Sequence, residues 1–339
     1  MTEHGQAGTP ARPHGQPLLL AGLGAATISS SAVLVVLAGS SPVSTAFYRS
    51  ALALPLLAVL AAIERRRLGK RAAAQRALAV LAGVFLAVDL ILWTHAIYDV
   101  GAGVATVLGN LQVLFVALIA WVAWRERPGV AVVLALPVVL TGVVLVSGLI
   151  GGPRPAVGYT AGLHPLAGIW YGLGTSMAYA GFLLILRRSS AGTAHIAGPV
   201  ADASAGTAIA SLAFGLVFGG LTLHPLWPAI GWLAMLALLS QTAGWLLITA
   251  SLPRLPAVVS SLMLLLQPAV SLVLAALILG QQPTLLQIAG AALTCGGAVA
   301  ASLAAVTRAP GGGPSTAGRP RSAQTARSAW PRRRSGRPA

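Results

Sequence analysis

The sequence predicts an all-α integral membrane protein with ten transmembrane helices arranged as two inverted five-helix repeats. Composition, the spacing of apolar segments and the distribution of positive charge carry this prediction. Of the 339 residues, 56% are hydrophobic and 8% are charged, and the mean hydropathy is +0.83. A soluble domain is about a quarter charged. A soluble fold could not bury this much apolar surface, so lipid is the expected solvent for most of the chain.

Long apolar segments define the predicted helices, since a spanning helix needs roughly 20 mainly apolar residues. The segments are 17–38, 43–63, 77–98, 102–124, 129–150, 166–186, 200–221, 229–251, 256–279 and 284–306. They are continuous and rich in Ala and Leu, without the alternation of a membrane barrel. The first repeat is predicted at 17–150 and the second at 166–306, joined by a periplasmic linker, 151–165. The polar ends, 1–16 and 307–339, are predicted to be disordered tails.

Positive charge is confined to one side of this topology. The chain carries 22 Lys and Arg against 6 Asp and Glu, a net charge of +16. Every basic residue except Arg49 and Arg154 lies in a tail or an even-numbered loop. Because positive loops stay cytoplasmic, both termini are predicted to lie in the cytoplasm, and the protein is predicted to lie in the cytoplasmic membrane of the cell. The basic C-terminal tail is expected to touch anionic lipid headgroups, and no nucleic-acid partner is expected.

The two halves align when the sequence is shifted by 155 positions. Five spans in each half mean that the second half enters the membrane from the opposite side. Inverted repeats of this kind are typical of secondary transporters, whose sites lie where the repeats meet. Small residues among the aligned positions also predict close helix packing in lipid. The aligned pairs are Gln112 with Gln267, Ala135 with Gly290, Gly142 with Gly297, and 125–128 with 280–283.

Two stretches resemble the EamA family of the drug/metabolite transporter superfamily. They are DLILWTHAIYDVGAGVATVLGNLQVLFVALIAWVAWRERP, from Asp89 to Pro128, and LMLLLQPAVSLVLAALILGQQPTLLQIAGAALTCGG, which ends at Gly297. Arg49 also fits that family's pattern. The resemblance implies ten helices in two repeats, cytoplasmic termini, and export of metabolites or amino acids. The chain departs from the pattern at Gln281, where the family usually has Glu, and at Val113, where it usually has Pro.

Ionisable residues within the spans are functional candidates, because charge is costly in a membrane. Asp89 lies in the middle of the third span and shares a helix face with Trp93. It is either a proton carrier or amine ligand, or a hydrogen-bonded structural group. His95 lies on another face with Asp99, and is either a proton carrier or a structural histidine.

Arg49 lies inside the second span, toward its outer end. Three interpretations remain open for it. Its side chain can snorkel to the periplasmic interface. It can instead bind a carboxylate in a central cavity, or form a salt bridge with Asp89.

Uncharged polar and aromatic residues complete the candidate substrate pathway. They serve either to bind a solute or to join helices by hydrogen bonds and packing. Pro268 follows Gln267 and is expected to break that helix at mid-depth, which frees a backbone carbonyl. The remaining candidates are Thr106, Asn110, Gln112, Ser260, Gln267, Tyr171 and Trp245.

The motifs favour transport over chemistry. The sequence has no GxxxxGK[ST] phosphate loop, no GxSxG and no HExxH, and its single cysteine, Cys295, excludes a cysteine metal cluster. We therefore expect no catalytic, cofactor or metal site. The predicted function is alternating-access transport of a small organic solute, an amino acid or related metabolite. Export is the expected direction, and coupling to protons is possible. The alternatives are a structural or sensory membrane subunit and a membrane-embedded lipid-modifying enzyme. Monomer and homodimer both remain open.

Overall fold

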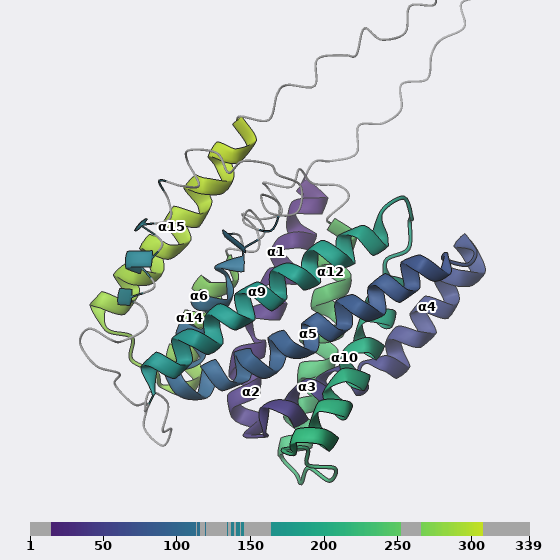
Figure 1. The fold of residues 1–339 in the computed structure, drawn as a ribbon, viewed down its shortest axis with the longest axis horizontal. Helices are drawn as coiled ribbons and strands as arrows, with labels where there is room; N and C mark the ends of the chain where they lie inside the picture. The colour runs from purple at the N-terminus through teal and green to yellow at the C-terminus, as the bar shows by residue number, and fades with distance from the viewer. Residues whose placement is uncertain are drawn as a thin grey trace, which may run out of the picture.

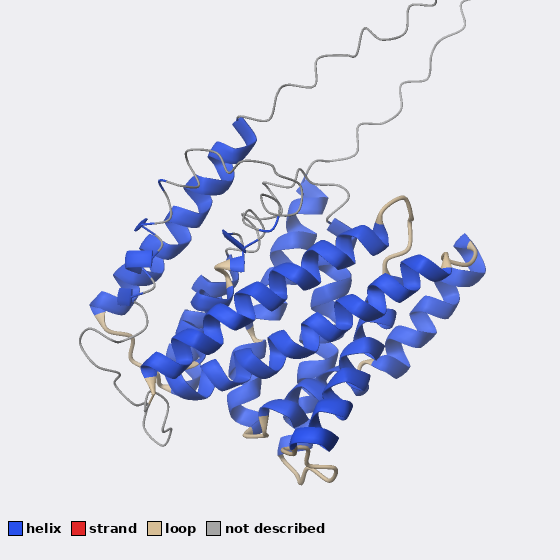
Figure 2. Cartoon of the chain, in the orientation of Figure 1, coloured by secondary structure: helices blue, strands red, loops and turns tan. Residues whose placement is uncertain are grey.

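The computed structural model describes residues 15–112, 164–251 and 266–307, with scattered positions between 114 and 145. These residues form helices joined by short loops (Figures 1 and 2). In chain order the helices are α1 (Gly15–Ser29), α2 (Ser31–Ala38), α3 (Pro42–Ala51), α4 (Leu54–Leu68), α5 (Ala73–Val100), α6 (Ala102–Gly109), α9 (Pro165–Ser190), α10 (Ala197–Phe218), α11 (Ala229–Leu236), the π-helix η1 (Ala237–Gly244), α12 (Trp245–Ser251), α14 (Leu266–Leu279) and α15 (Leu285–Thr307).

Helix length and composition make this a multi-pass membrane protein. Five helical segments are long and apolar enough to cross a bilayer: Pro42–Leu68, Ala73–Val100, Pro165–Ser190, Ala197–Phe218 and Ala229–Ala250. Large apolar side chains cover their outward faces, as expected where lipid is the solvent. The last part of the predicted span 102–124, most of 129–150 and the first part of 256–279 lie outside the described residues.

Four predicted spans are not continuous α-helices in the described residues, which corrects the prediction made from hydropathy. The first breaks at Ser30, where Ser29, Ser30 and Ser31 each donate a hydrogen bond to a carbonyl of the preceding turn. Such bonds compete with regular helical ones. The second span breaks at residues 52–53, before Pro55 in the first turn of α4. The fourth span, 102–124, has a turn at Asn110 and Leu111. The eighth contains η1, and π-helical turns are frequent at functional sites.

Helices from the two predicted halves pack against each other throughout the core. Helix α5 of the first half lies against α9 and α10 of the second half, and α3 and α4 also contact α10. The α1–α2 pair lies against α11, η1 and α12, while α6 contacts α14. Glycines permit the closest approach: a Cβ on Gly206 would collide with the carbonyl oxygen of Val80, and one on Gly83 with that of Ala203. Gly142 meets Gly290 and Thr294 in the same way, as the small residues predicted.

A polar cluster ties α4 and α5 to α10 at the end of the bundle that bears Arg65–Arg67. The Glu64 carboxylate accepts the backbone N–H groups of Ile196, Ala197 and Gly198 at 2.8–2.9 Å. Those groups begin α10 and have no acceptor within their own helix. Arg71 pairs with Asp202 at 2.7 Å. Burial lowers the pKa of Arg71, and the Asp202 charge opposes that shift. We call Glu64, Arg71, Asp202 and residues 196–198 the basic-end clamp.

Neutral hydrogen bonds tie the same helices together at the opposite end. The hydroxyls of Ser41 and Ser44 donate to the carbonyl of Gly220, just beyond α10. The Ser44 hydroxyl also accepts the Thr222 N–H at 2.8 Å. Tyr98, near the end of α5, donates to the Ser40 carbonyl at 2.6 Å. Hydrogen bonds therefore join the α3–α4 segment to α10 at both ends.

Candidate functional site

A cavity lies between these two ends, where helices from both predicted halves meet. It leaves about 60 Å³ for the centres of water-sized molecules. At roughly 10–15 Å³ per water, that is room for a few waters or part of a small solute. Its lining comes from α1, α3, α5, α6, α9, α12 and α14, with Ser31 at the start of α2. The polar, charged and aromatic lining residues are Ser29, Ser31, Arg49, Asp89, Trp93, Thr106, Asn110, Thr175, Tyr179, Trp245 and Gln267.

Arg49 turns into this cavity rather than toward the membrane surface, and only 3% of the residue is exposed. Its Nε donates to Gln241 Oε1 at 2.9 Å and its Nη2 donates to Ser240 Oγ at 2.8 Å. The described residues place no carboxylate within 4.0 Å of the guanidinium. They also supply no hydrogen-bond acceptor for Nη1. Arg49 is thus a buried cation that neutral oxygens hold in place.

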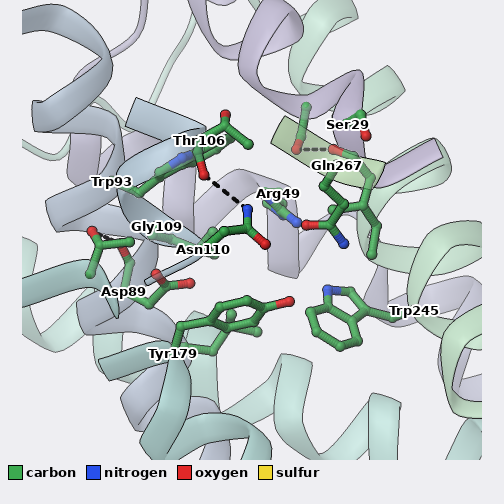
Figure 3. A pocket seen from close by; sticks show the side chains of 15 residues that line it. Ser29, Arg49, Asp89, Trp93, Thr106, Gly109, Asn110, Tyr179, Trp245 and Gln267 are labelled. Atoms are coloured by element: carbon green, nitrogen blue, oxygen red, sulfur yellow. Dashed lines mark hydrogen bonds between the residues drawn. The ribbon is translucent and has the colours of Figure 1, made fainter. Parts of the chain in front are cut away.

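Asp89 faces the same cavity from α5, together with Trp93, as their shared helix face predicts. The residue is 7% exposed, and within the described part of the chain its carboxylate has neither a hydrogen bond nor an ion pair. The salt bridge between Asp89 and Arg49, one of the three interpretations from sequence, is therefore absent from this conformation. Figure 3 shows the two charged side chains directed into one space from different helices. Arg49 and Asp89, two buried side chains of opposite charge that do not form an ion pair with each other, make up the centre of the site.

Several neutral groups around the cavity also lack partners. Trp245 Nε1, Gln267 Nε2, Asn110 Oδ1 and Gln112 Oε1 are buried and unpaired among the described residues. Each such group costs about 1–3 kcal/mol unless water or a ligand satisfies it. The Tyr179 hydroxyl lies near the side chains of both aligned glutamines, Gln112 and Gln267. Gln267 lines the cavity, whereas Gln112 does not.

Further polar and aromatic contacts shape the cavity wall. The Asn110 side-chain amide donates to the Thr106 carbonyl at 2.9 Å, and the Thr106 hydroxyl lies 3.1 Å from that of Ser271. The Thr106–Ser271 contact joins α6 to α14. Trp245 stands edge-on to Tyr179, with ring centres 6.2 Å apart, and Figure 3 shows the two rings along one side of the cavity. The wall is therefore rigid and aromatic on that side.

Three predicted site residues in the described part of the chain do not line the cavity: His95, Tyr171 and Gln112. His95 stacks on Tyr171 with ring centres 4.9 Å apart, at the contact between α5 and α9. Neither residue reaches the cavity. No ion pair joins His95 to Asp99 in the described structure. Ser260 lies outside the described residues.

Sequence reasoning missed several polar residues of the site and its surroundings. Gln241 donates through Nε2 to Ser204 Oγ at 2.9 Å while accepting from Arg49. Ser204 stands 155 positions after Arg49, so the repeat offset could have revealed it. Asp202, an ionisable residue within a predicted span, was also missed, as was Glu64. Among the described residues, no group of three or more His, Cys, Asp or Glu could hold a metal ion.

Comparison with known proteins places both halves in one family. A model described as the EamA-like transporter family matches residues 16–148 and again residues 166–303. The fold resembles a solved structure titled only "Crystal structure of protein", with a TM-score of 0.59 and 18% identity. The match covers 85% of this chain and 98% of that chain, and at this identity it supports the fold alone. No curated protein matches the sequence.

Proposed function

Because the chain belongs to the EamA-like transporter family, we propose that it carries a small zwitterionic solute across the cytoplasmic membrane. The solute is an amino acid or a related metabolite, moved outward by alternating access. Membership of the family establishes membrane transport in general. The opposite charges of Arg49 and Asp89, facing one cavity without a direct ion pair, carry the proposal on substrate.

The architecture that we propose is ten spans in two inverted repeats, with both termini cytoplasmic. The family model matches twice along the chain, which supports the division. Helix contacts support the repeat as well. A shift of 155 positions carries α5 onto α11–α12 and carries α1–α2 onto α9. The α5–α9 contact and the contact of α1–α2 with α11–α12 are then equivalent. The basic residues support the orientation and would meet anionic headgroups.

Substrate recognition follows from the two charges. Among the described residues the hydrogen bonds of Arg49 use Nε and Nη2, so Nη1 can donate to a carboxylate, and Asp89 can accept from an ammonium group. A zwitterion placed between them would neutralise both buried charges. Removing one partner of a buried ion pair is costly, so the site favours solutes with both groups over simple amines or acids. Buried amide and indole groups nearby would hydrogen-bond the rest of the solute.

Proton coupling is a further part of the proposal. A carboxylate inside a membrane protein often relays protons. Asp89 has no cation within 4.0 Å in the described structure, so protonation would not disrupt an existing ion pair. Asp89 would then bind either a proton or the ammonium group of the solute, but not both at once. Exchange of protons for solute requires such alternative binding.

Flux measurements in liposomes test the proposal. Reconstituted protein is assayed with radiolabelled L-alanine, L-threonine and L-phenylalanine, and with ethylamine and propionate as matched single-charge compounds. We expect saturable flux of at least one amino acid and little of either single-charge compound. Arg49→Met and Asp89→Asn should abolish that flux, whereas Tyr171→Phe, outside the cavity, should retain it. No flux of any amino acid, or full flux in Arg49→Met, would contradict the proposal and favour a sensory or structural subunit.

A further inference from the structure

Gln241 connects three helices at a single buried amide. It lies in η1, and the residue is 1% exposed. Its Oε1 accepts from Arg49 on α3 at 2.9 Å, and its Nε2 donates to Ser204 on α10 at 2.9 Å. Neighbouring Ser240 accepts a second hydrogen bond from Arg49 at 2.8 Å. Gln241 and Ser240 are the partners that the described structure gives the guanidinium.

The chemistry of these groups determines their orientation. A guanidinium has donors only, so the amide of Gln241 must turn its oxygen to Arg49 and its nitrogen to Ser204. Nε and Nη2 lie along one edge of the planar guanidinium, and both are occupied. This holds the plane of the group and leaves Nη1, with two hydrogens, at the end. A planar fork held in this way is already arranged for a carboxylate.

Neutrality of the partners is as important as their geometry. A carboxylate at position 241 would cancel the charge of Arg49 and compete with the substrate. Gln supplies the hydrogen bond without the charge. Ser204, which stands at the position aligned with Arg49, likewise adds an acceptor without a second cation. The hydrogen-bond partners of Arg49 therefore leave its positive charge uncancelled.

We propose that Gln241, supported by Ser204 and Ser240, is the positioning residue that presents the Nη1 end of Arg49 to the carboxylate of the substrate. The positioning rests on the hydrogen bonds, and the role in substrate binding rests on the proposed function. The π-helical turn has a part in this, because it brings consecutive residues 240 and 241 to the same guanidinium.

A substrate-free experiment tests the positioning. Melting temperatures are measured in detergent for Arg49→Met, Gln241→Leu and the double variant. We expect the double variant to melt no lower than the less stable single variant, because both substitutions break one interaction. Gln287→Leu is the matched control, because in the described structure the hydrogen bonds of that buried glutamine are with Thr284, three residues away. Its effect should add to that of Arg49→Met. Additive losses for Arg49→Met and Gln241→Leu would overturn the proposal.

Transport by Gln241→Glu tests the role in substrate binding. The added carboxylate should pair with Arg49, so the melting temperature should equal or exceed that of the wild type. For the amino acid among L-alanine, L-threonine and L-phenylalanine that the wild type moves best, KM should rise about tenfold or more, equivalent to one lost charge-assisted hydrogen bond. A merely structural role would change stability and KM in the same direction.

The outcomes separate this inference from the proposed function. Wild-type flux with an unchanged KM in Gln241→Glu would overturn the inference alone. Absence of wild-type flux for all three amino acids would overturn the proposed function and the substrate-binding role with it. The melting temperatures would still decide the positioning of Arg49.

Discussion

Replacing Glu64 by Ala removes the carboxylate that ties α4 to the start of α10. The backbone N–H groups of Ile196, Ala197 and Gly198 would lose their acceptor. Loss of a helix cap typically costs about 1–2 kcal/mol, and loss of a negative charge at a helix N-terminus about 0.3–1 kcal/mol more. Because three N–H groups lose one acceptor, we expect a loss in the upper part of the combined range, about 2–3 kcal/mol. Glu64→Gln retains one acceptor oxygen but no charge, so about half that loss is expected.

Thermal unfolding of the purified protein measures this effect. At about 2 °C per kcal/mol for a chain of this size, Glu64→Ala should lower the melting temperature by about 4–6 °C. Arg67→Ala, an exposed change on the same helix, is the control and should shift it by about 1 °C at most. If the melting temperature of Glu64→Ala equals that of the wild type, water replaces the carboxylate at no cost in free energy. The Glu64 contact of the basic-end clamp would then not stabilise the protein. If Glu64→Gln melts as low as Glu64→Ala, charge alone accounts for the effect.

Three further predictions concern transport, packing and the ion pair of the basic-end clamp. Asp89→Asn should abolish amino-acid flux both with and without a pH gradient, and flux that persists with its pH dependence unchanged would place both ammonium binding and proton coupling elsewhere. Gly206→Leu should separate α5 from α10 and reduce the yield of monodisperse protein on size-exclusion chromatography, whereas Gly296→Leu, with open space around it, should not. Arg71→Ala should cost about 1–3 kcal/mol by leaving Asp202 without its 2.7 Å partner, and a melting curve unchanged in Arg71→Ala would contradict this.

Helix positions were largely predictable because lipid imposes a strong constraint on composition. The segment predicted at 166–186 became Pro165–Ser190, and that predicted at 284–306 became Leu285–Thr307. The breaks were not predictable in the same way. Ser30 and the π-helical turn of η1 preserve the apolar pattern, and they depend on local hydrogen bonds that a hydropathy profile does not detect.

The charged part of the site was predictable, as were neutral lining residues such as Asn110 and Gln267, whereas the neutral partners of Arg49 were not. Asp89 and Arg49 stood out because an ionisable residue in an apolar span is rare. Gln241 and Ser204 gave no comparable signal, because neutral polar residues commonly join helices in membranes. Gln241 also reaches Arg49 across 192 positions of sequence. His95 illustrates the converse, since a titratable residue on a spanning helix stacks on Tyr171 outside the cavity.

The sequence by itself determined that this is a membrane protein of two similar halves, because apolar run length, loop charge and repeat offset are properties of the chain. Only the tertiary structure decided which polar groups share one cavity. Helix rotation and contact between the halves turn Arg49 inward, place Asp89 opposite without an ion pair, and bring Gln241 between α3 and α10. Those relations depend on packing across nearly two hundred residues, and local sequence does not encode them.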